Sequence, residues 1–210
     1  KAFGFGEPTG IELPSEVSGI LRPLEKWDVY STGSIPMGQE LAVTPLQLIV
    51  AHAALANGGK LLRPFLILQH TDAIVSSGTS AIPVRSTTSL VAPPVSQEIA
   101  EWVVQKPMVE VVKRGTGRQA KLEDYTVFGK TGTAQKVDPE TGRYAKDRDV
   151  CSFICGGPAD DPQLLVLIVV DEPTEGENHG GGTVAAPHAA RLLNQALIHQ
   201  RIQGEHARRE

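Results

Sequence analysis

The longest apolar run in the chain is LLVLIVV, at residues 164–170, and it requires a position that is shielded from water. Seven residues cannot cross a membrane as a helix, because a spanning helix needs about 20. A short apolar run with turn residues on either side is typical of a buried β-strand. The chain is therefore expected to build a sheet around residues 164–170.

Two other segments predict neighbouring strands, YTVFGKTGTAQ at residues 125–135 and CSFICGG at residues 151–157. After the glycines at 180–182, apolar residues recur every three or four positions, which predicts a helix of about four turns. Its apolar stripe consists of Ala189, Leu192, Leu193, Ala196 and Leu197. A helix with one apolar stripe that follows strands is expected to lie across their sheet.

The first 127 residues have a different character, mainly helical and loop-forming. Residues 1–40 are rich in Gly, Pro and Ser, and residues 71–94 resemble a connector. The segment Thr44–Gln47 fits a helix-capping box, while Ser96 is expected to cap a second helix and Pro107 to begin a third. The sequence thus predicts an α+β fold, an antiparallel sheet flanked by helices, with the strands concentrated in residues 128–210.

Charge and composition exclude one class of partner. The net charge is −4 and the isoelectric point about 5.9, and adjacent basic residues occur only as the pairs Lys113-Arg114 and Arg208-Arg209. A nucleic-acid-binding domain normally carries a basic face, so no nucleic-acid partner is expected. A length of 210 residues suits one sizeable domain or two small ones.

Two cysteines, Cys151 and Cys155, lie four positions apart in a predicted strand. At about 3.3 Å per residue their Cα atoms would be roughly 13 Å apart. A disulfide needs Cα atoms within about 7 Å, so these two cysteines are not expected to bridge. No further Cys or His lies nearby at ligand spacing, so the sequence indicates two buried thiols and no metal site.

The segment FGKTGTAQK, residues 128–136, carries the chemical interest of the chain. A phosphate-binding loop would need a glycine five residues before Gly129-Lys130, but Asp124 occupies that position and its carboxylate would repel phosphate. Considered alone, the segment could be either a strand that receives a carboxylate or a strand that ends in a polar hairpin.

Several blocks, in order along the chain, resemble the penicillin-binding protein transpeptidases of the monofunctional, high-molecular-weight class B type. GKTGTAQK matches the K-T-G motif, the third of the three motifs of that family. The resembling blocks are FGFGEPTGIELPSE (3–16), GQELAVTPLQLIVAHAALANGGKLLRP (38–64), MVEVV with GTGRQAKLEDYTVFGKTGTAQ (108–135), SFICGGPADDPQLLVLIVVDEP (152–173) and GGGTVAAP (180–187). The chain departs from the family at Glu40, where glycine is usual, and at His188.

The resemblance implies the penicillin-binding/serine β-lactamase-like fold and D,D-transpeptidation, an acyl transfer from D-Ala-D-Ala peptides to a serine. Lys130 and Thr133 would be catalytic, Lys130 through its positive field and proton transfer, Thr133 through a backbone N–H in the oxyanion hole. The same two residues, with Thr131 and Gly132, would bind the substrate, since the threonine hydroxyls would receive its carboxylate. The resemblance implies no cofactor and no metal.

The implied partners are peptidoglycan stem peptides and β-lactams. The location would be extracytoplasmic, with attachment to a membrane only through an anchor outside this sequence. The parent protein would serve cell division or cell elongation. The chain opens with KAFGFGEPTG, without a starting methionine or a signal-peptide pattern, so we expect it to be a C-terminal portion of a transpeptidase domain.

The other two family motifs, S-x-x-K with the nucleophilic serine and S-x-N, do not occur in the sequence. The chain alone is therefore expected to be inactive. Two of the family's five strands would also be missing, which predicts an open sheet edge that is covered by a companion N-terminal fragment or by a second copy. A non-catalytic binding or assembly module is the alternative, and an upstream reading frame encoding both motifs would distinguish the enzyme from the module.

Overall fold

A computed structural model describes residues 1–66, 92–174 and 180–204, apart from the side chains of residues 146 and 147. The predicted connector at 71–94 lies almost wholly outside these ranges. Within them, no helix is both long enough and apolar enough to cross a membrane.

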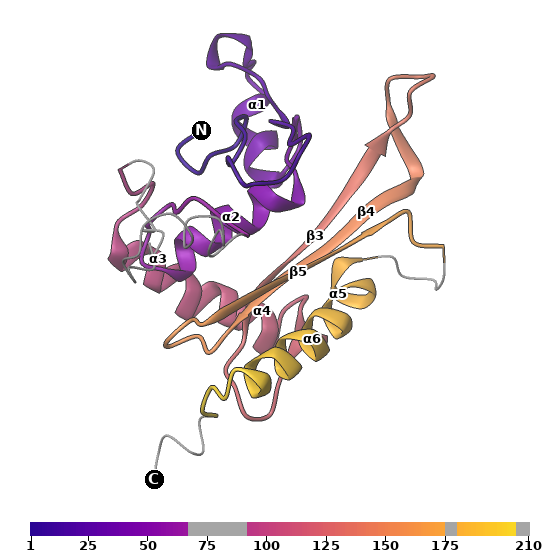
Figure 1. Ribbon diagram of the computed structural model, residues 1–210. Helices are drawn as coiled ribbons and strands as arrows, with labels where there is room; N and C mark the ends of the chain where they lie inside the picture. Colours follow the sequence, from indigo (N-terminus) through magenta and orange to yellow (C-terminus); the bar gives the residue numbers. More distant parts are fainter. Residues whose placement is uncertain (67–91, 175–179, 205–210) are drawn as a thin grey trace, which may run out of the picture.

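Three long strands form one antiparallel sheet in the order β3–β4–β5 (Figure 1). These are β3 (Phe128–Val137), β4 (Tyr144–Gly157) and β5 (Leu164–Asp171). All three predicted strands are confirmed. β4 begins well before Cys151 because its first residues continue the ladder with β3, up to the pair Val137 and Tyr144. A separate short pair joins β1 (Ile20–Leu21) to β2 (Leu41–Ala42).

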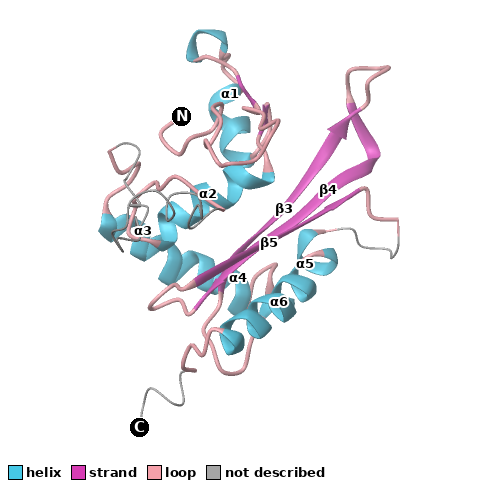
Figure 2. Cartoon of the chain, viewed as in Figure 1, coloured by secondary structure: helices cyan, strands magenta, loops and turns pink. Residues whose placement is uncertain are grey.

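Helices and connecting loops make up the rest of the described structure (Figure 2). They are α1 (Ser31–Ser34), α2 (Pro45–Ala56), α3 (Gln97–Val103), α4 (Val109–Lys113), α5 (Gly181–Val184) and α6 (Ala186–His199), with 3-10 turns at Leu24–Lys26, Ile35–Met37 and Arg118–Ala120. The prediction that Pro107 begins a new helix is wrong. Pro107 lies inside a π-helical turn, Val104–Met108, that joins α3 directly to α4. The wider turn accommodates a residue that has no N–H to donate.

Helical segments cover both faces of the sheet, α2 and the turn Val104–Met108 on one side and α5 and α6 on the other, while α3 packs against α2 (Figure 1). Because alternate residues of a strand face opposite sides, Phe153 and Cys155 of β4 share one face. There they pack against Leu193 and Leu197 of α6, and all four are fully buried. On the opposite face Phe128 packs against Val104, Met108 and Val109.

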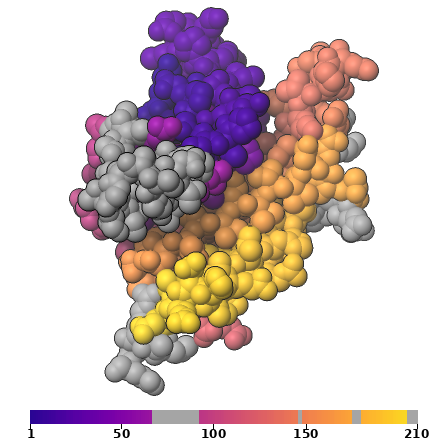
Figure 3. Space-filling view, viewed as in Figure 1, coloured from indigo at the N-terminus to yellow at the C-terminus, as the bar shows by residue number. Residues whose placement is uncertain are grey.

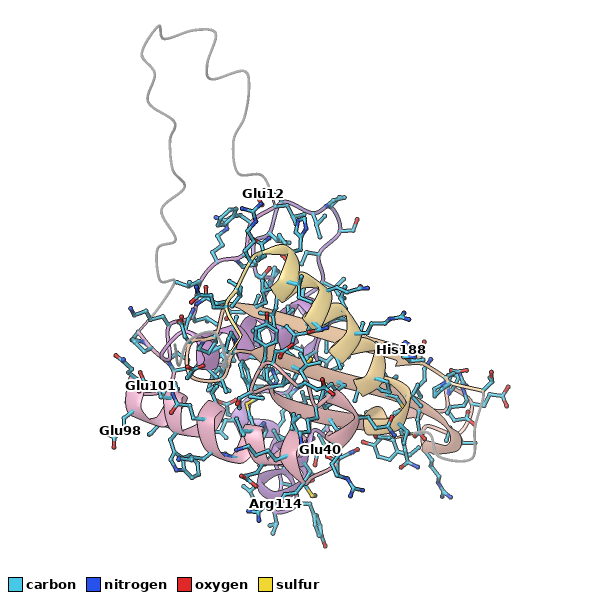
Figure 4. All side chains as sticks on the ribbon, turned by 90° about the horizontal axis from the view of Figure 1, so that it is seen from below. Glu12, Glu40, Glu98, Glu101, Arg114 and His188 are labelled. Carbon is cyan, nitrogen blue, oxygen red and sulfur yellow. The ribbon has the colours of Figure 1, made fainter. Side chains whose placement is uncertain are left out.

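α6 lies across β4 and β5, as its apolar stripe predicts. One member of that stripe was assigned wrongly, since Leu192 is 48% exposed while Leu193 is fully buried. His188 is exposed on the same helix (Figure 4), so this departure from the family does not alter the core.

Both cysteines are free and buried, which confirms that they do not bridge. Burial raises the pKa of Cys155 to about 12, and it also raises that of Cys151. A thiol with such a pKa stays protonated at neutral pH and is a poor nucleophile. The two cysteines therefore contribute to packing.

The predicted capping box at the start of α2 is confirmed: Thr44 accepts from the Gln47 N–H, and the Gln47 side chain accepts from the Thr44 N–H at 2.9 Å. Gln47 also has a second role. Its side-chain amide donates to the carbonyls of Glu7 and Ser18, both at 2.8 Å, and the residue is only 1% exposed. One side chain thus fastens two N-terminal loops to α2.

Glu40 has a left-handed backbone conformation, with φ of 61°. Glycine adopts this conformation without strain, which is consistent with the glycine usual there in the family. The Glu40 carboxylate pairs with the Arg22 guanidinium and accepts hydrogen bonds from Ser31, at 2.9 Å, and from Ser34. These contacts of Glu40 (labelled in Figure 4) hold the segment 22–40 together.

A cluster of ion pairs joins all three strands near one end of the sheet. Glu172, directly after β5, pairs with Arg148 of β4 at 2.8 Å and with Lys136 of β3 at 2.7 Å. Lys136 also contacts Asp171 at 3.1 Å. The hydrogen bonds from Arg148, and then those from Lys136, lower the pKa of Glu172 to about 2.

The Glu172 carboxylate is therefore expected to stay ionised to about pH 2. Because its pKa is lower in the folded protein than the ordinary value of 4.5, its contribution to stability is present above pH 4.5 and is lost as the pH falls through 2. A carboxyl NMR titration measures this midpoint, and Arg148→Gln is expected to move it upward. A midpoint near 4.5 in the unmodified protein would contradict the ion-pair assignment.

Candidate active site

The segment Lys130–Thr133 lies where β3 leaves the core. The first two residues of the strand, Phe128 and Gly129, are buried, whereas Lys130 and Thr133 are exposed. β3 is also an edge strand, since β4 is its only partner among the described residues. An edge strand presents unpaired backbone groups on which an extended peptide can add. The predicted site residues therefore lie on a surface that can accept a peptide.

Side chains of the segment point to two sides of the strand, because successive residues alternate. Lys130 and Gly132 belong to one face, and Thr131 and Thr133 belong to the other. The Lys130 ammonium donates to the Thr131 carbonyl at 2.7 Å. In the space-filling view the tip of the β3–β4 hairpin projects from the body of the molecule, beside the N-terminal residues (Figure 3).

His52 of α2 is a neighbour of Lys130 that the sequence analysis did not identify. Its Nδ1 lies 2.8 Å from the Leu48 carbonyl, which can only accept, so Nδ1 carries the hydrogen. Burial lowers the pKa of His52, and the positive charge of Lys130 lowers it further. A neutral imidazole thus lies on the lysine side of the strand.

On the opposite face, each threonine hydroxyl has a defined partner. Thr131 Oγ1 lies 2.8 Å from Thr116 Oγ1, and Thr133 Oγ1 accepts from the Gly181 N–H at 3.2 Å. Thr116 belongs to the loop after α4, and Gly181 is the first residue of α5. Two elements remote in sequence therefore hold the two hydroxyls in place.

Gly132 is required by the fold as well as by any approaching substrate. A Cβ at this position would overlap the Ser152 hydroxyl on the neighbouring strand. The family resemblance implied only that Gly132 binds the substrate. The adjacent strand supplies a second reason, since Ser152 is the register partner of Gly132.

The structure thus brings all four predicted residues together on one strand, but three neighbours were missed. The glycines at 180–182 were expected only to precede the last helix, and neither Thr116 nor His52 was identified as a site residue. Their closeness to Lys130–Thr133 depends on contacts across the fold, which no local pattern encodes.

Comparisons with known proteins identify the family and the fold of the chain. A family model described as the penicillin-binding protein transpeptidase domain matches residues 1–194. Stage V sporulation protein D of Bacillus subtilis is 39% identical over 197 residues, covering 94% of this chain and 29% of that protein. Penicillin-binding protein PbpB of Mycolicibacterium smegmatis is 34% identical over 191 residues, covering 89% of this chain and 29% of that protein. The chain therefore spans less than a third of these relatives.

Solved structures show the same fold. Penicillin-binding protein 3 of Mycobacterium tuberculosis, in its apo form, has a TM-score of 0.79 and 29% identity, covering 97% of this chain and 46% of that one. The TP domain of penicillin-binding protein 3 from Burkholderia pseudomallei has a TM-score of 0.79 and 27% identity, covering 97% of this chain and 56% of that one. These matches confirm the predicted fold class and the family resemblance.

Proposed function

The chain belongs to the penicillin-binding protein transpeptidase family, and we propose that it forms the substrate-binding wall of a D,D-transpeptidase that cross-links peptidoglycan. The observation that carries this proposal is the exposed edge-strand segment Lys130–Thr133, with its two hydroxyls held in place on one side and its lysine on the other. Such a surface suits a peptide that ends in a carboxylate.

Each residue of the segment has a distinct role in this reaction. The Thr131 and Thr133 hydroxyls donate to the terminal carboxylate of D-Ala-D-Ala, and Lys130 supplies the positive field that favours it. The Thr133 N–H stabilises the oxyanion that forms when a serine attacks the peptide carbonyl. One such donor contributes on the order of 3 kcal/mol to transition-state stabilisation. Gly132 leaves the strand open to the peptide backbone.

The attacking serine comes from a segment outside this chain, because neither S-x-x-K nor S-x-N occurs in it. β-Lactams are expected to bind the same wall, since they carry a comparable carboxylate. Penicillin-binding protein 3 of Mycobacterium tuberculosis has been solved with aztreonam and with ampicillin. The protein that carries this chain would act outside the cytoplasm, attached to the membrane by an anchor.

Labelling with a fluorescent penicillin tests the proposal. The isolated chain is expected to remain unlabelled, and the gene product that carries it is expected to become acylated at a serine. Stoichiometric labelling of the isolated chain would contradict the proposed division of the site. A gene product without both upstream motifs, and without labelling, would support a non-catalytic binding or assembly module instead.

Lys130→Ala is expected to lower the rate of acylation of the gene product about 100-fold or more, because the carboxylate loses its positive partner. Stopped-flow labelling measures this rate. Lys136→Ala is the matched control, since Lys136 lies on the same strand but pairs with Asp171 and Glu172. Equal losses in both variants would show that Lys130 has no special role.

The same fold leaves a surface for a companion segment. Within the described residues, β5 pairs only with β4, so its outer edge is open. An apolar groove of about 370 Å³ lies beside it, lined by Ile49, Val50 and Ala53 of α2 and by Leu164 and Leu165 of β5. An N-terminal portion of the same protein would cover both, and a second copy of this chain is the alternative. A monodisperse monomer of the isolated chain in sedimentation, with cooperative unfolding, would contradict both arrangements.

A further inference from the structure

Thr116 is the one residue of the Gly115-Thr116-Gly117 loop that offers a side chain, and its hydroxyl lies 2.8 Å from that of Thr131. Thr116 is exposed, like Thr133 on the strand nearby. Thr116 lies within one of the blocks that resemble the family, but the sequence assigns it no role, because it lies 15 residues before Thr131 in a turn that follows a helix.

The backbone of this loop is held rigidly. The N–H groups of Gly115 and Gly117 donate to the Glu110 and Val111 carbonyls, both at 3.0 Å. On the other side, Gly182 of α5 packs so closely that a Cβ there would overlap the Thr116 carbonyl. The same Cβ would lie 3.4 Å from Thr131 Cγ2, so α5, the loop and β3 meet at one point. Thr116 is thus fixed relative to Thr131 by contacts on both sides.

The hydroxyls of Thr116, Thr131 and Thr133 have hydrogens left over for an external acceptor. Thr133 Oγ1 accepts from the Gly181 N–H, so its own hydrogen is available to donate. In the pair of Thr116 and Thr131, one hydroxyl donates to the other, which leaves one hydrogen for an external acceptor. Three hydroxyls therefore present two hydrogens, and one carboxylate has two oxygens to receive them.

We propose that Thr116 is a positioning residue of the carboxylate subsite: its hydroxyl donates to Thr131 Oγ1 and so directs the Thr131 hydrogen toward the same anion that Thr133 binds. This inference rests on the proposed function and extends it by adding a third hydroxyl to the recognition of the substrate carboxylate. Thr116 acts through Thr131, so it governs binding of the acidic group rather than the chemical step.

The test uses the gene product that carries this chain and compares benzylpenicillin with its methyl ester, which lacks the anionic carboxylate. Thr116→Val is expected to weaken the initial non-covalent complex with benzylpenicillin about 10-fold, as for a lost hydrogen bond that supports a charged group. The rate constant of acylation from that complex is expected to stay within about twofold, and binding of the ester is expected to be unaffected.

Thr116→Ser retains the hydroxyl and is expected to keep the wild-type affinity. Thr141→Val, in the exposed β3–β4 turn, is the control and is expected to leave the affinity unchanged. Thr116→Ala is a second variant in case valine disturbs the loop, and melting temperatures identify any variant that does not fold. If benzylpenicillin acylates the wild-type protein, and both Thr116→Val and Thr116→Ala keep the wild-type preference for the acid over the ester, the inference is overturned and the proposed function stands. Wild-type protein that benzylpenicillin does not acylate would overturn the proposed function and this inference with it.

Discussion

Replacing Gly181 with alanine is expected to destabilise the protein by about 3 kcal/mol or more, at the upper end of what an added methyl group costs in a packed interior. Gly181 is buried, and a Cβ there would overlap the carbonyl oxygens of Ser152 and Gly132. Both obstacles are backbone atoms of paired strands, which cannot rotate away as a side chain can. The midpoint of urea unfolding, followed by tryptophan fluorescence, measures the loss.

The adjacent glycine supplies a matched control. At Gly180 the nearest atom to an added Cβ is Thr183 Oγ1, at 4.0 Å, so Gly180→Ala meets no steric obstacle. Its cost is expected to be about 1 kcal/mol or less, the loss associated with a poorer helix cap. Equal destabilisation by both substitutions would show that close packing of α5 on β3 and β4 is not the cause.

Gly181→Ala is also expected to impair penicillin acylation of the gene product beyond its effect on stability. The Gly181 N–H donates to Thr133 Oγ1 at 3.2 Å, so a displaced α5 loses its hold on the threonine hydroxyl. Labelling at a temperature where the variant remains folded separates the two effects. Normal labelling under those conditions would show that this hydrogen bond does not position Thr133.

Gln47→Ala is the second substitution with a large expected effect, about 3 to 5 kcal/mol of destabilisation. The change removes the amide that donates to the Glu7 and Ser18 carbonyls and leaves both without that donor in a site where Gln47 is only 1% exposed. An unsatisfied buried polar group costs about 1–3 kcal/mol, and the loss of packed volume adds to this. Urea unfolding again measures the effect.

Gln97→Ala on α3 is the control for this substitution. Gln97 is exposed, and within the described residues its side chain bonds only to Glu101, four residues later in the same helix. Such a pair contributes a few tenths of a kcal/mol. Gln47→Glu is expected to be no better than alanine, because a carboxylate cannot donate to the two carbonyls. A mild effect of Gln47→Ala would mean that water replaces the lost amide.

Much of the local structure could be predicted from the sequence because the relevant signals are themselves local. Thr44 and Gln47 satisfy each other's N–H groups within four residues, so the start of α2 followed from sequence. The run at Leu164–Asp171 could be assigned to a strand because its apolar side chains admit few other positions. The prediction from Pro107 was wrong because a π-helical turn accommodates the proline, and that turn and α4 both pack on β3.

The site was predictable to the same extent, and for the same reason. Lys130–Thr133 form one continuous motif, so the sequence alone predicted the strand, and the other family blocks along the chain identified the family. Only the tertiary structure placed His52 beside Lys130, Thr116 beside Thr131 and Gly181 beside Thr133. These neighbours come from α2, from the loop after α4 and from α5. Packing on the sheet brings Thr116 and Gly181 within hydrogen-bonding reach of the two threonines, and it brings His52 close enough for the charge of Lys130 to lower its pKa.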